Sequence, residues 1–276
     1  MRSFLGVKLL PATVLDWSGL VKLFNAGFAE YLVPMQMDDS GLREHVAING
    51  IDLDCSRIAV EEEAVAFVLI GLRRAAAWVG GMGTVPSRRG CGLGERVLFA
   101  GIEAARDRGC RTVFLEVIEA NEPAIGLYRK LGFAPVRELL VWSLPPIGTE
   151  SPASTIVEPD VAHGWIVRNR RGREPWQRAD EAVAALRKRG SAVAGLMIER
   201  GREVRAAALV AERGDRVSLL QVAALDAEAA REALLAAGGK RSIHLANVPD
   251  DDPASSAMRE LGGRLVARQQ EMLLRL

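Results

Sequence analysis

The chain has 276 residues, which is long for one compact domain and sufficient for two. Hydrophobic residues make up 49% and charged residues 26%, so a sizeable core can form, and the formal net charge of +1 does not indicate a nucleic-acid or membrane-surface partner. No apolar run approaches the roughly 20 residues that span a bilayer, and the short apolar stretch Phe4–Leu10 is better explained as a strand than as a signal peptide. The three cysteines and three histidines are scattered, which argues against a disulfide framework and a metal site. We therefore expect a cytoplasmic protein without bound metal, monomeric or homodimeric.

The first half alternates between helical and strand patterns. Thr13 is expected to open a helix with Asp16 as its capping-box partner, and Asp39 or Ser40 to cap the next helix. The strands that follow these helices read as an antiparallel meander, and further helices and strands alternate after it. The predicted elements of this half are strand 7–10, helix 13–31, helix 39–49, strands 57–60, 64–71 and 75–85, helix 93–108, strand 112–118, helix 123–132 and strand 136–144.

A linker and a second half follow. Residues 145–154 hold three prolines, a glycine and several Ser/Thr, which is typical of a connection between domains. Beyond it the pattern predicts a helix at 176–189 and strands at 193–198, 204–211, 217–223 and 265–274.

The two halves are related in sequence. Without gaps, Gly109–Gly132 aligns with Gly239–Gly262, and the identical pairs are Gly109/Gly239, Arg111/Arg241, Leu115/Leu245, Pro123/Pro253, Ala124/Ala254, Arg129/Arg259, Leu131/Leu261 and Gly132/Gly262. Two similar strand–helix units with coincident caps would be the simpler explanation. We favour a duplicated domain.

A glycine-rich segment, Arg89-Gly90-Cys91-Gly92-Leu93-Gly94, stands between a strand end and a helix start. The first N–H groups of a helix lack intrahelical partners, and glycines let the backbone approach a ligand closely, so this turn can bind a pyrophosphate. Arg88 and Arg89 add positive charge. The dinucleotide fingerprint needs a third glycine where Glu95 stands, and the Lys-Ser/Thr pair of a nucleotide-binding P-loop is absent. A purely structural tight turn is the remaining alternative.

Two segments together resemble a known family. The run from Val85 to Gly94 looks like the acyl-CoA motif of the GNAT N-acetyltransferase superfamily, and the second motif of that family resembles Leu115-Glu116-Val117, Asn121, Pro123-Ala124, Leu127-Tyr128 and Leu131-Gly132-Phe133. The resemblance covers about residues 7–145. It implies an α/β fold with a mixed (α+β) sheet flanked by helices, whose central strands splay apart where the pantetheine arm inserts, and the duplication implies two tandem domains of this kind.

The resemblance also implies a cosubstrate, acetyl-CoA, and assigns residues to it. The backbone of Gly83, Thr84 and Val85 would pair with the pantetheine arm. The pyrophosphate would be held beside Arg88 by the amides of Arg89, Gly90, Cys91, Gly92, Leu93 and Gly94. Asn121 would contact the arm, and Tyr128 would face the thioester sulfur.

Residue chemistry agrees with such a transfer. Tyr128, with an ordinary pKa near ~10, can donate a hydrogen bond or proton to a leaving thiolate, although it can also be a core aromatic. Glu116 lies within an apolar strand, where a carboxylate is costly unless it is solvated or paired, so it is either a base for the amine or part of an ion pair with Arg96 or Arg129. Glu30 and Asp38 are weaker candidates for the base.

The acceptor site is expected near Glu30, Tyr31, Met35 and Trp78. The acceptor itself, a small-molecule or peptide amine, cannot be read from these residues.

The second half has lost the equivalents of these residues in the gap-free alignment. Tyr128 falls on Met258, Asn121 on Asp251, and the glycine loop on Leu219–Ala224. We predict a catalytic domain at residues 1–145 and a degenerate GNAT-like domain at 155–276 that lacks the acyl-CoA loop, as in tandem acetyltransferases. Each half ends in a single strand, and we expect each strand to complete a sheet by crossing to, or packing against, the other half.

The predicted function is N-acyl transfer: an acetyl group moves from acetyl-CoA to a primary amine by direct attack on the thioester. The alternative is a catalytically silent acyl-CoA-binding or protein-interaction module. The presence of both Asn121 and Tyr128 favours the enzyme.

Overall fold

The computed structural model describes residues 6–33, 35–148 and 152–276. Phe4 and Leu5 of the predicted first strand, and residues 149–151 of the predicted linker, lie outside the described residues. The chain forms two compact units, one made of Met1–Val136 with Glu271–Leu276 and the other of Arg137–Gln270. Within the described ranges, no helix is long and apolar enough to cross a membrane.

The first unit has a mixed sheet. Its strands lie in the order β1-β2-β3-β4-β5, with antiparallel pairs up to β4 and a parallel pair between β4 and β5. Its elements are β1 (Lys8–Pro11), α1 (Trp17–Gly27), α2 (Asp39–Asn49), β2 (Ile51–Val60), β3 (Ala64–Arg73), β4 (Ala76–Thr84), α3 (Leu93–Asp107), β5 (Thr112–Ile118), α4 (Glu122–Lys130) and the start of β6 (Ala134–Leu144).

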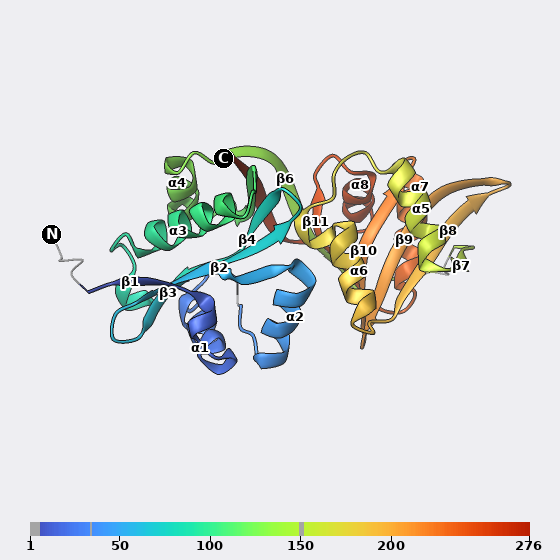
Figure 1. Ribbon diagram of the computed structural model, residues 1–276. Coiled ribbons are helices and arrows are strands. Elements are labelled where there is room, and N and C mark those ends of the chain that lie inside the picture. The colour runs from blue at the N-terminus through green and yellow to red at the C-terminus, as the bar shows by residue number, and fades with distance from the viewer. Residues whose placement is uncertain (1–5, 34, 149–151) are drawn as a thin grey trace. The chain divides into compact units, whose positions relative to one another are not determined.

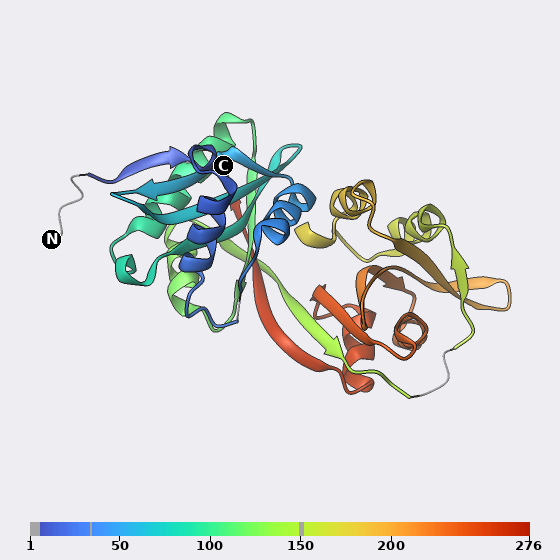
Figure 2. The same cartoon turned by 90° about the horizontal axis from the view of Figure 1, so that it is seen from below.

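Helices cover both faces of this sheet (Figure 1). On one face α3 and α4 enclose a core that includes Val97, Leu98 and Ile102 of α3. On the other face α1 and α2 enclose a smaller core around Phe24 and Phe67, and Figure 2 shows these two helices in blue in front of the sheet. The sheet is therefore buried on both sides, which explains the continuous apolar run of β3.

The second unit repeats this order of elements. Its strands lie in the order β6-β11-β10-β9-β8-β7, and β10 and β11 are again parallel neighbours. Its elements are β7 (Thr155–Val157), α5 (Pro159–Asn169), the 3-10 turn η3 (Trp176–Arg178), α6 (Asp180–Lys188), β8 (Val193–Arg200), β9 (Glu203–Arg213), β10 (Arg216–Ala224), α7 (Ala227–Gly238), β11 (Ser242–Pro249), α8 (Pro253–Glu260) and β12 (Arg264–Arg275). The predicted α/β class with two similar mixed-sheet domains is confirmed.

Strand segments pass between the two halves of the chain, as expected. Residues 137–144 of β6 belong to the second unit, where β6 pairs antiparallel with β11 from Leu139 to Leu144. The segment Glu271–Leu276 belongs to the first unit, whose core includes the fully buried Met272. The chain therefore divides at Val136 rather than at the prolines after residue 144, because a strand ending one half is paired within the other.

Helix starts differ in detail from the sequence prediction. Asp16 is itself the N-cap of α1, accepting from the amide of Gly19, and Thr13 lies in a 3-10 turn at Ala12–Val14. Asp38 caps α2 by accepting from Gly41 N, so neither Asp39 nor Ser40 is the cap. In both helices the aspartate directly before the first helical residue accepts from the third amide of the helix, which is the usual N-cap geometry.

Candidate functional site

The site begins where two parallel strands separate. In the described part of the chain, β4 and β5 pair only from Ala76/Thr112 to Trp78/Phe114, although β4 continues to Thr84 and β5 to Ile118. A cavity of about 600 Å³ occupies the wedge between the diverging strands. It is walled by Met82, Gly83 and Thr84 of β4, Glu116 and Val117 of β5, the glycine loop, the turn after α1 and the start of α4.

Strand β4 has a bulge at Gly80, next to the wedge, and a histidine of α2 is hydrogen-bonded to it. The β3–β4 register shifts around Gly80, whose carbonyl lies 2.8 Å from Nε2 of His45. Nδ1 of His45 lies 3.2 Å from the side-chain nitrogen of Asn49. Burial lowers the pKa of His45, so its neutral ring donates to Gly80 and accepts from Asn49. A Cβ at Gly80 would lie 2.6 Å from the Trp78 indole, so this position needs a glycine.

The glycine loop leaves the first turn of α3 open. Gly90 and Gly92 adopt left-handed φ values of 72° and 75°, which favour glycine. Gly92 is the N-cap of α3 and has no side chain with which to cap it, whereas α1, α2 and α4 carry side-chain caps. The first amides of α3 and the positive end of its dipole therefore face the cavity, a donor set that fits a diphosphate.

Close packing of glycines brings the walls together. A Cβ at Gly94 would lie 2.9 Å from Cε of Met82, and a Cβ at Gly83 would lie 2.9 Å from Cα of Gly27. The end of α1 and the end of β4 thus approach each other backbone to backbone beside the cavity, while the start of α3 packs against the Met82 side chain.

Two side chains with acid–base chemistry line the same cavity. Tyr128 on α4 is buried, its ring makes an edge contact with Phe133, and burial together with the nearby Tyr31 raises the pKa of Tyr128 above its ordinary range. Oε2 of Glu116 accepts a 2.6 Å hydrogen bond from the indole Nε1–H of Trp78. Tyr128 therefore stays protonated at neutral pH and can act as a donor, while Glu116 offers an oriented carboxylate.

Comparison with known proteins finds a family that is similar to part of this chain. Residues 24–133 match the model of the acetyltransferase (GNAT) family. The similarity to that family covers less than half of the chain and includes the cavity described above.

Two curated relatives of the GNAT domain carry the same name. The mycothiol acetyltransferase of Thermomonospora curvata is 40% identical over 65 residues, which is 24% of this chain, and that of Cellulomonas flavigena is 33% identical over 76 residues, which is 28% of this chain. In both cases the match spans 22% of the length of the relative.

Solved structures match over nearly the whole chain. A GCN5-related N-acetyltransferase from Sphaerobacter thermophilus is 18% identical with a TM-score of 0.74, over 98% of this chain and 95% of that one. A tandem GNAT protein from the clavulanic acid biosynthesis pathway is 15% identical with a TM-score of 0.70, over 98% of both chains. These likenesses show the fold: two GNAT-like domains in tandem.

Most residues predicted for the site meet in the cavity of the GNAT domain. Those that line it are Glu30, Tyr31, Gly83, Thr84, Arg88, Arg89, Gly90, Gly92, Leu93, Gly94, Glu116, Asn121 and Tyr128. Asn121 also caps α4, since its side-chain oxygen accepts from Ala124 N at 3.3 Å.

Five predicted residues do not line the cavity: Val85, Cys91, Trp78, Met35 and Asp38, of which Asp38 caps α2. The amide of Val85 donates to Val65 O and its carbonyl accepts from Arg88 N, so the backbone of Val85 is already used within the protein. The thiol of Cys91 contacts the carbonyl of Arg89. The ring of Trp78 is buried in the core, and its only polar atom, the indole nitrogen, needs a hydrogen-bond partner. That partner is Glu116, which lines the cavity, so Trp78 contacts a cavity residue without lining the cavity itself.

The two loop arginines are engaged with protein groups. Arg88 forms an ion pair with Glu61. The Arg89 amide donates to Pro86 O, and its guanidinium donates to the turn after α1. The anion-binding capacity of the loop therefore begins at the amide of Gly90 and comes from backbone groups. In the chain as described, no group of three or more His, Cys, Asp and Glu could hold a metal ion.

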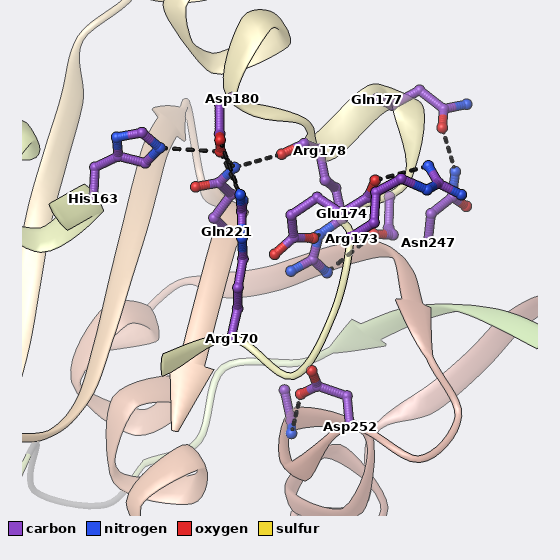
Figure 3. Close-up of polar contacts among 12 residues, drawn as sticks. His163, Arg170, Arg173, Glu174, Gln177, Arg178, Asp180, Gln221, Asn247 and Asp252 are labelled. Carbon is purple, nitrogen blue, oxygen red and sulfur yellow. Dashed lines mark hydrogen bonds and ion pairs between the residues drawn. The ribbon is translucent and has the colours of Figure 1, made fainter. Parts of the chain in front are cut away.

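The corresponding wedge of the second unit is bridged by its own chain (Figure 3). The strands β10 and β11 likewise pair only from Arg216/Ser242 to Ser218/His244 in the described register. Gln221 of β10 donates to the carbonyl of Arg178 at 2.7 Å and to Asp180 at 2.9 Å. From β11, Asn247 donates to Gln177 at 2.7 Å.

A buried ion pair completes this bridge. Nε of Arg178 lies 3.1 Å from Oε2 of Glu174, and the two side chains are only 4% and 8% exposed. Arg178 also donates to the carbonyl of Ala246 at 3.4 Å. Residues 174–180 thus join the two diverging strands in the place where the first unit has its cavity.

In the second unit the helix that corresponds to α3 is α7, and its N-terminus is not open. Asp226 caps α7 by accepting from Ala229 N, and its carboxylate pairs with Arg205. The gap-free alignment was wrong here, because Leu219–Ala224 lie within β10 and only Leu225 and Asp226 connect it to α7. The connection between β10 and α7 is therefore shorter than that between β4 and α3, and it contains no glycine.

Sequence reasoning missed the link from Trp78 to Glu116 and the bridge at residues 174–180. A glutamate in an apolar strand was a signal that some donor must be near it. No local pattern identified Trp78 as that donor.

Proposed function

We propose that this chain is an acyl-CoA-dependent N-acetyltransferase with one active site, located in the first unit. The observation that carries the proposal is the single wedge that joins an uncapped helix terminus, a buried tyrosine and an oriented glutamate. Acetyl-CoA would supply an acetyl group activated as a thioester. The amides from Gly90 to Gly94 would hold its pyrophosphate, and the backbone of Gly83 and Thr84, with Asn121, would hold the pantetheine arm.

The roles of the two acid–base residues follow from their chemistry. Glu116 accepts a proton from the incoming ammonium group, through a water molecule, so that the nitrogen lone pair can attack the carbonyl carbon. As the carbon–sulfur bond breaks, the hydroxyl of Tyr128 donates a hydrogen bond or its proton to the sulfur. A positioned donor or base of this kind typically contributes about 10²–10⁴ in rate.

The acceptor is proposed to be a small-molecule primary amine. The names of the curated relatives favour a small molecule over a protein. Glu30 and Tyr31, at the end of the cavity formed by the turn after α1, are the proposed acceptor contacts.

We further propose that the second unit is degenerate and binds no acyl-CoA. Its wedge is bridged by residues 174–180, and the α7 terminus carries a carboxylate where an anion would have to bind. An anion there would meet like charge and lose the open amides.

Calorimetric titration with acetyl-CoA tests the site count, and we expect one molecule per chain. Thioester consumption against a panel of primary amines then tests the reaction. Two molecules per chain would contradict the degenerate second unit, and no binding would overturn the function. Binding without turnover on any amine would favour a silent acyl-CoA-binding module.

A further inference from the structure

Arg89 joins two walls of the cavity through its side chain. Its Nε donates to Thr84 O at 3.2 Å, at the end of β4. Its Nη2 donates to Ala29 O and, at 3.5 Å, to Gly27 O, and its Nη1 lies 3.3 Å from Oε2 of Glu30. All three nitrogens of the guanidinium are therefore directed at the protein.

The groups that Arg89 contacts need a cation. The last carbonyls of a helix lack intrahelical partners and lie at the negative end of its dipole. The last turn of α1 contains no basic residue of its own. Arg89, distant in sequence, supplies the missing charge to the carbonyls of Gly27 and Ala29.

The turn held in this way has an unfavourable backbone. Glu30 has a φ of +62°, a left-handed conformation that is unfavourable for a residue other than glycine. Local bonds in this turn run from Tyr31 N to Phe28 O at 3.1 Å and from Ala29 N to Ala26 O at 3.3 Å. Arg89 adds one contact to the carbonyl of Ala29, directly before Glu30, and one to the carboxylate of Glu30.

The same turn carries the acceptor side of the cavity. Tyr31 and Leu32 line the cavity together with Tyr128, and the Tyr31 ring packs edge-on against Phe28 at 5.2 Å. The position of Tyr31 therefore depends on a turn that a residue of the glycine loop holds in place.

We propose that Arg89 is a positioning residue for the acceptor side of the cavity, and that its guanidinium fastens the turn 28–31 to the glycine loop instead of binding the pyrophosphate. This inference rests on the proposed function, because it concerns the same site. When acetyl-CoA binds and orders the glycine loop, the contacts of Arg89 also order the turn 28–31. Binding of acetyl-CoA therefore places Tyr31 for contact with the amine.

The test uses coenzyme A itself as the probe on the full chain. In the wild type, saturating coenzyme A should slow amide exchange both at residues 90–95 and at 27–33. In Arg89→Gln, protection of the loop should persist, protection of the turn should disappear, and coenzyme A affinity should change less than about threefold. With an acceptor from the amine panel, its KM should rise about tenfold, as expected for lost charge-assisted hydrogen bonds.

Three further variants sharpen the result. Arg89→Lys keeps the charge but not the fork of donors, so it should restore protection of the turn in part. Glu30→Gln leaves the loop untouched and should loosen the turn in the same direction. Arg106→Gln removes a charge from an exposed Glu103 pair on α3 and should match the wild type.

The outcomes separate the two proposals. A tenfold or greater loss of coenzyme A affinity in Arg89→Gln, or protection of the turn that persists in that variant, would overturn the positioning role alone. Failure of the wild type to bind coenzyme A would overturn the proposed function and this role with it.

Discussion

The indole nitrogen of Trp78 donates a hydrogen bond of 2.6 Å to Oε2 of Glu116 across the point where β4 and β5 diverge. Trp78 is the last residue of β4 in the described pairing with β5. Its partner there is Phe114, and Glu116 lies two residues further along β5. The bond therefore joins the strands at the closed end of the wedge and fixes the glutamate side chain against the cavity.

Replacing Trp78 by Phe should lower kcat about tenfold or more, because a hydrogen bond to a charged group is worth roughly 1.5–3 kcal/mol. The KM for acetyl-CoA should change little. In the Glu116→Gln background the same replacement should have almost no further effect, since both changes act through one carboxylate. Steady-state kinetics on the four proteins measures this coupling.

Trp142→Phe is the matched control for that cycle. Trp142 is buried in the second unit, and its indole nitrogen has no hydrogen-bond partner among the described residues. This variant should keep wild-type kinetics. Fully additive effects of Trp78→Phe and Glu116→Gln would show that Trp78 does not act through Glu116.

Tyr128→Phe should reduce kcat by about 10²–10⁴ while the affinity for acetyl-CoA stays similar. Because burial and Tyr31 raise the pKa of Tyr128, the wild-type rate should not fall through ionisation of this phenol between about pH 7 and 9. The measurement is a pH–rate profile of both proteins. Tyr31→Phe, the change at the other of the two tyrosines, should alter the acceptor KM more than kcat.

Asp180→Asn should destabilise the chain at neutral pH, and the difference from wild type should shrink on acidification. Partial burial would raise the pKa of Asp180, but hydrogen bonds from Arg170, His163 and Gln221 outweigh it and hold the pKa below its ordinary value of 3.8. Asp180 therefore contributes stability above about pH 4, and this contribution is lost as pH falls toward the folded-state pKa.

Urea unfolding at pH 7, 5 and 3 measures this difference. Burial raises the pKa of Glu174, so this residue changes the free energy of unfolding with pH in the opposite direction. Glu174 is present in both proteins, so its contribution cancels in the difference between them. Asp160→Asn, which removes an exposed pair with Arg187, should change stability little. A gap between wild type and Asp180→Asn that is constant from pH 7 to 3 would argue against the role of Asp180.

Met272→Ala should destabilise the first unit by about 2–5 kcal/mol, because the Met272 side chain is fully buried in the core of that unit. Thermal unfolding followed with and without acetyl-CoA measures the loss. Val266→Ala, at a partly exposed position of the same strand, should stay within about 0.5 kcal/mol of wild type. Deleting residues 155–276 removes Met272 as well, and a soluble 1–150 fragment that binds acetyl-CoA would contradict this account.

The sequence by itself determined the order of the elements in the first half, the relation between the two halves and the glycine loop. Periodicity located β5 at Thr112–Ile118, and the glycines between β4 and α3 identified the anion-binding turn, because both depend on residues close together in the chain. The family resemblance carried the assignment of Tyr128.

Tertiary structure decided which side chains meet. Trp78 and Glu116 are 38 residues apart, and Arg89 reaches a turn 59 to 62 residues earlier. Such contacts depend on strand register, on where pairing ends and on how closely glycines let helices approach, and no local pattern encodes them. Tertiary structure also decided the bridge at residues 174–180 and the exchange of terminal strands. Buried donors and strand edges need hydrogen-bond partners, and which partners are near depends on how the whole chain packs.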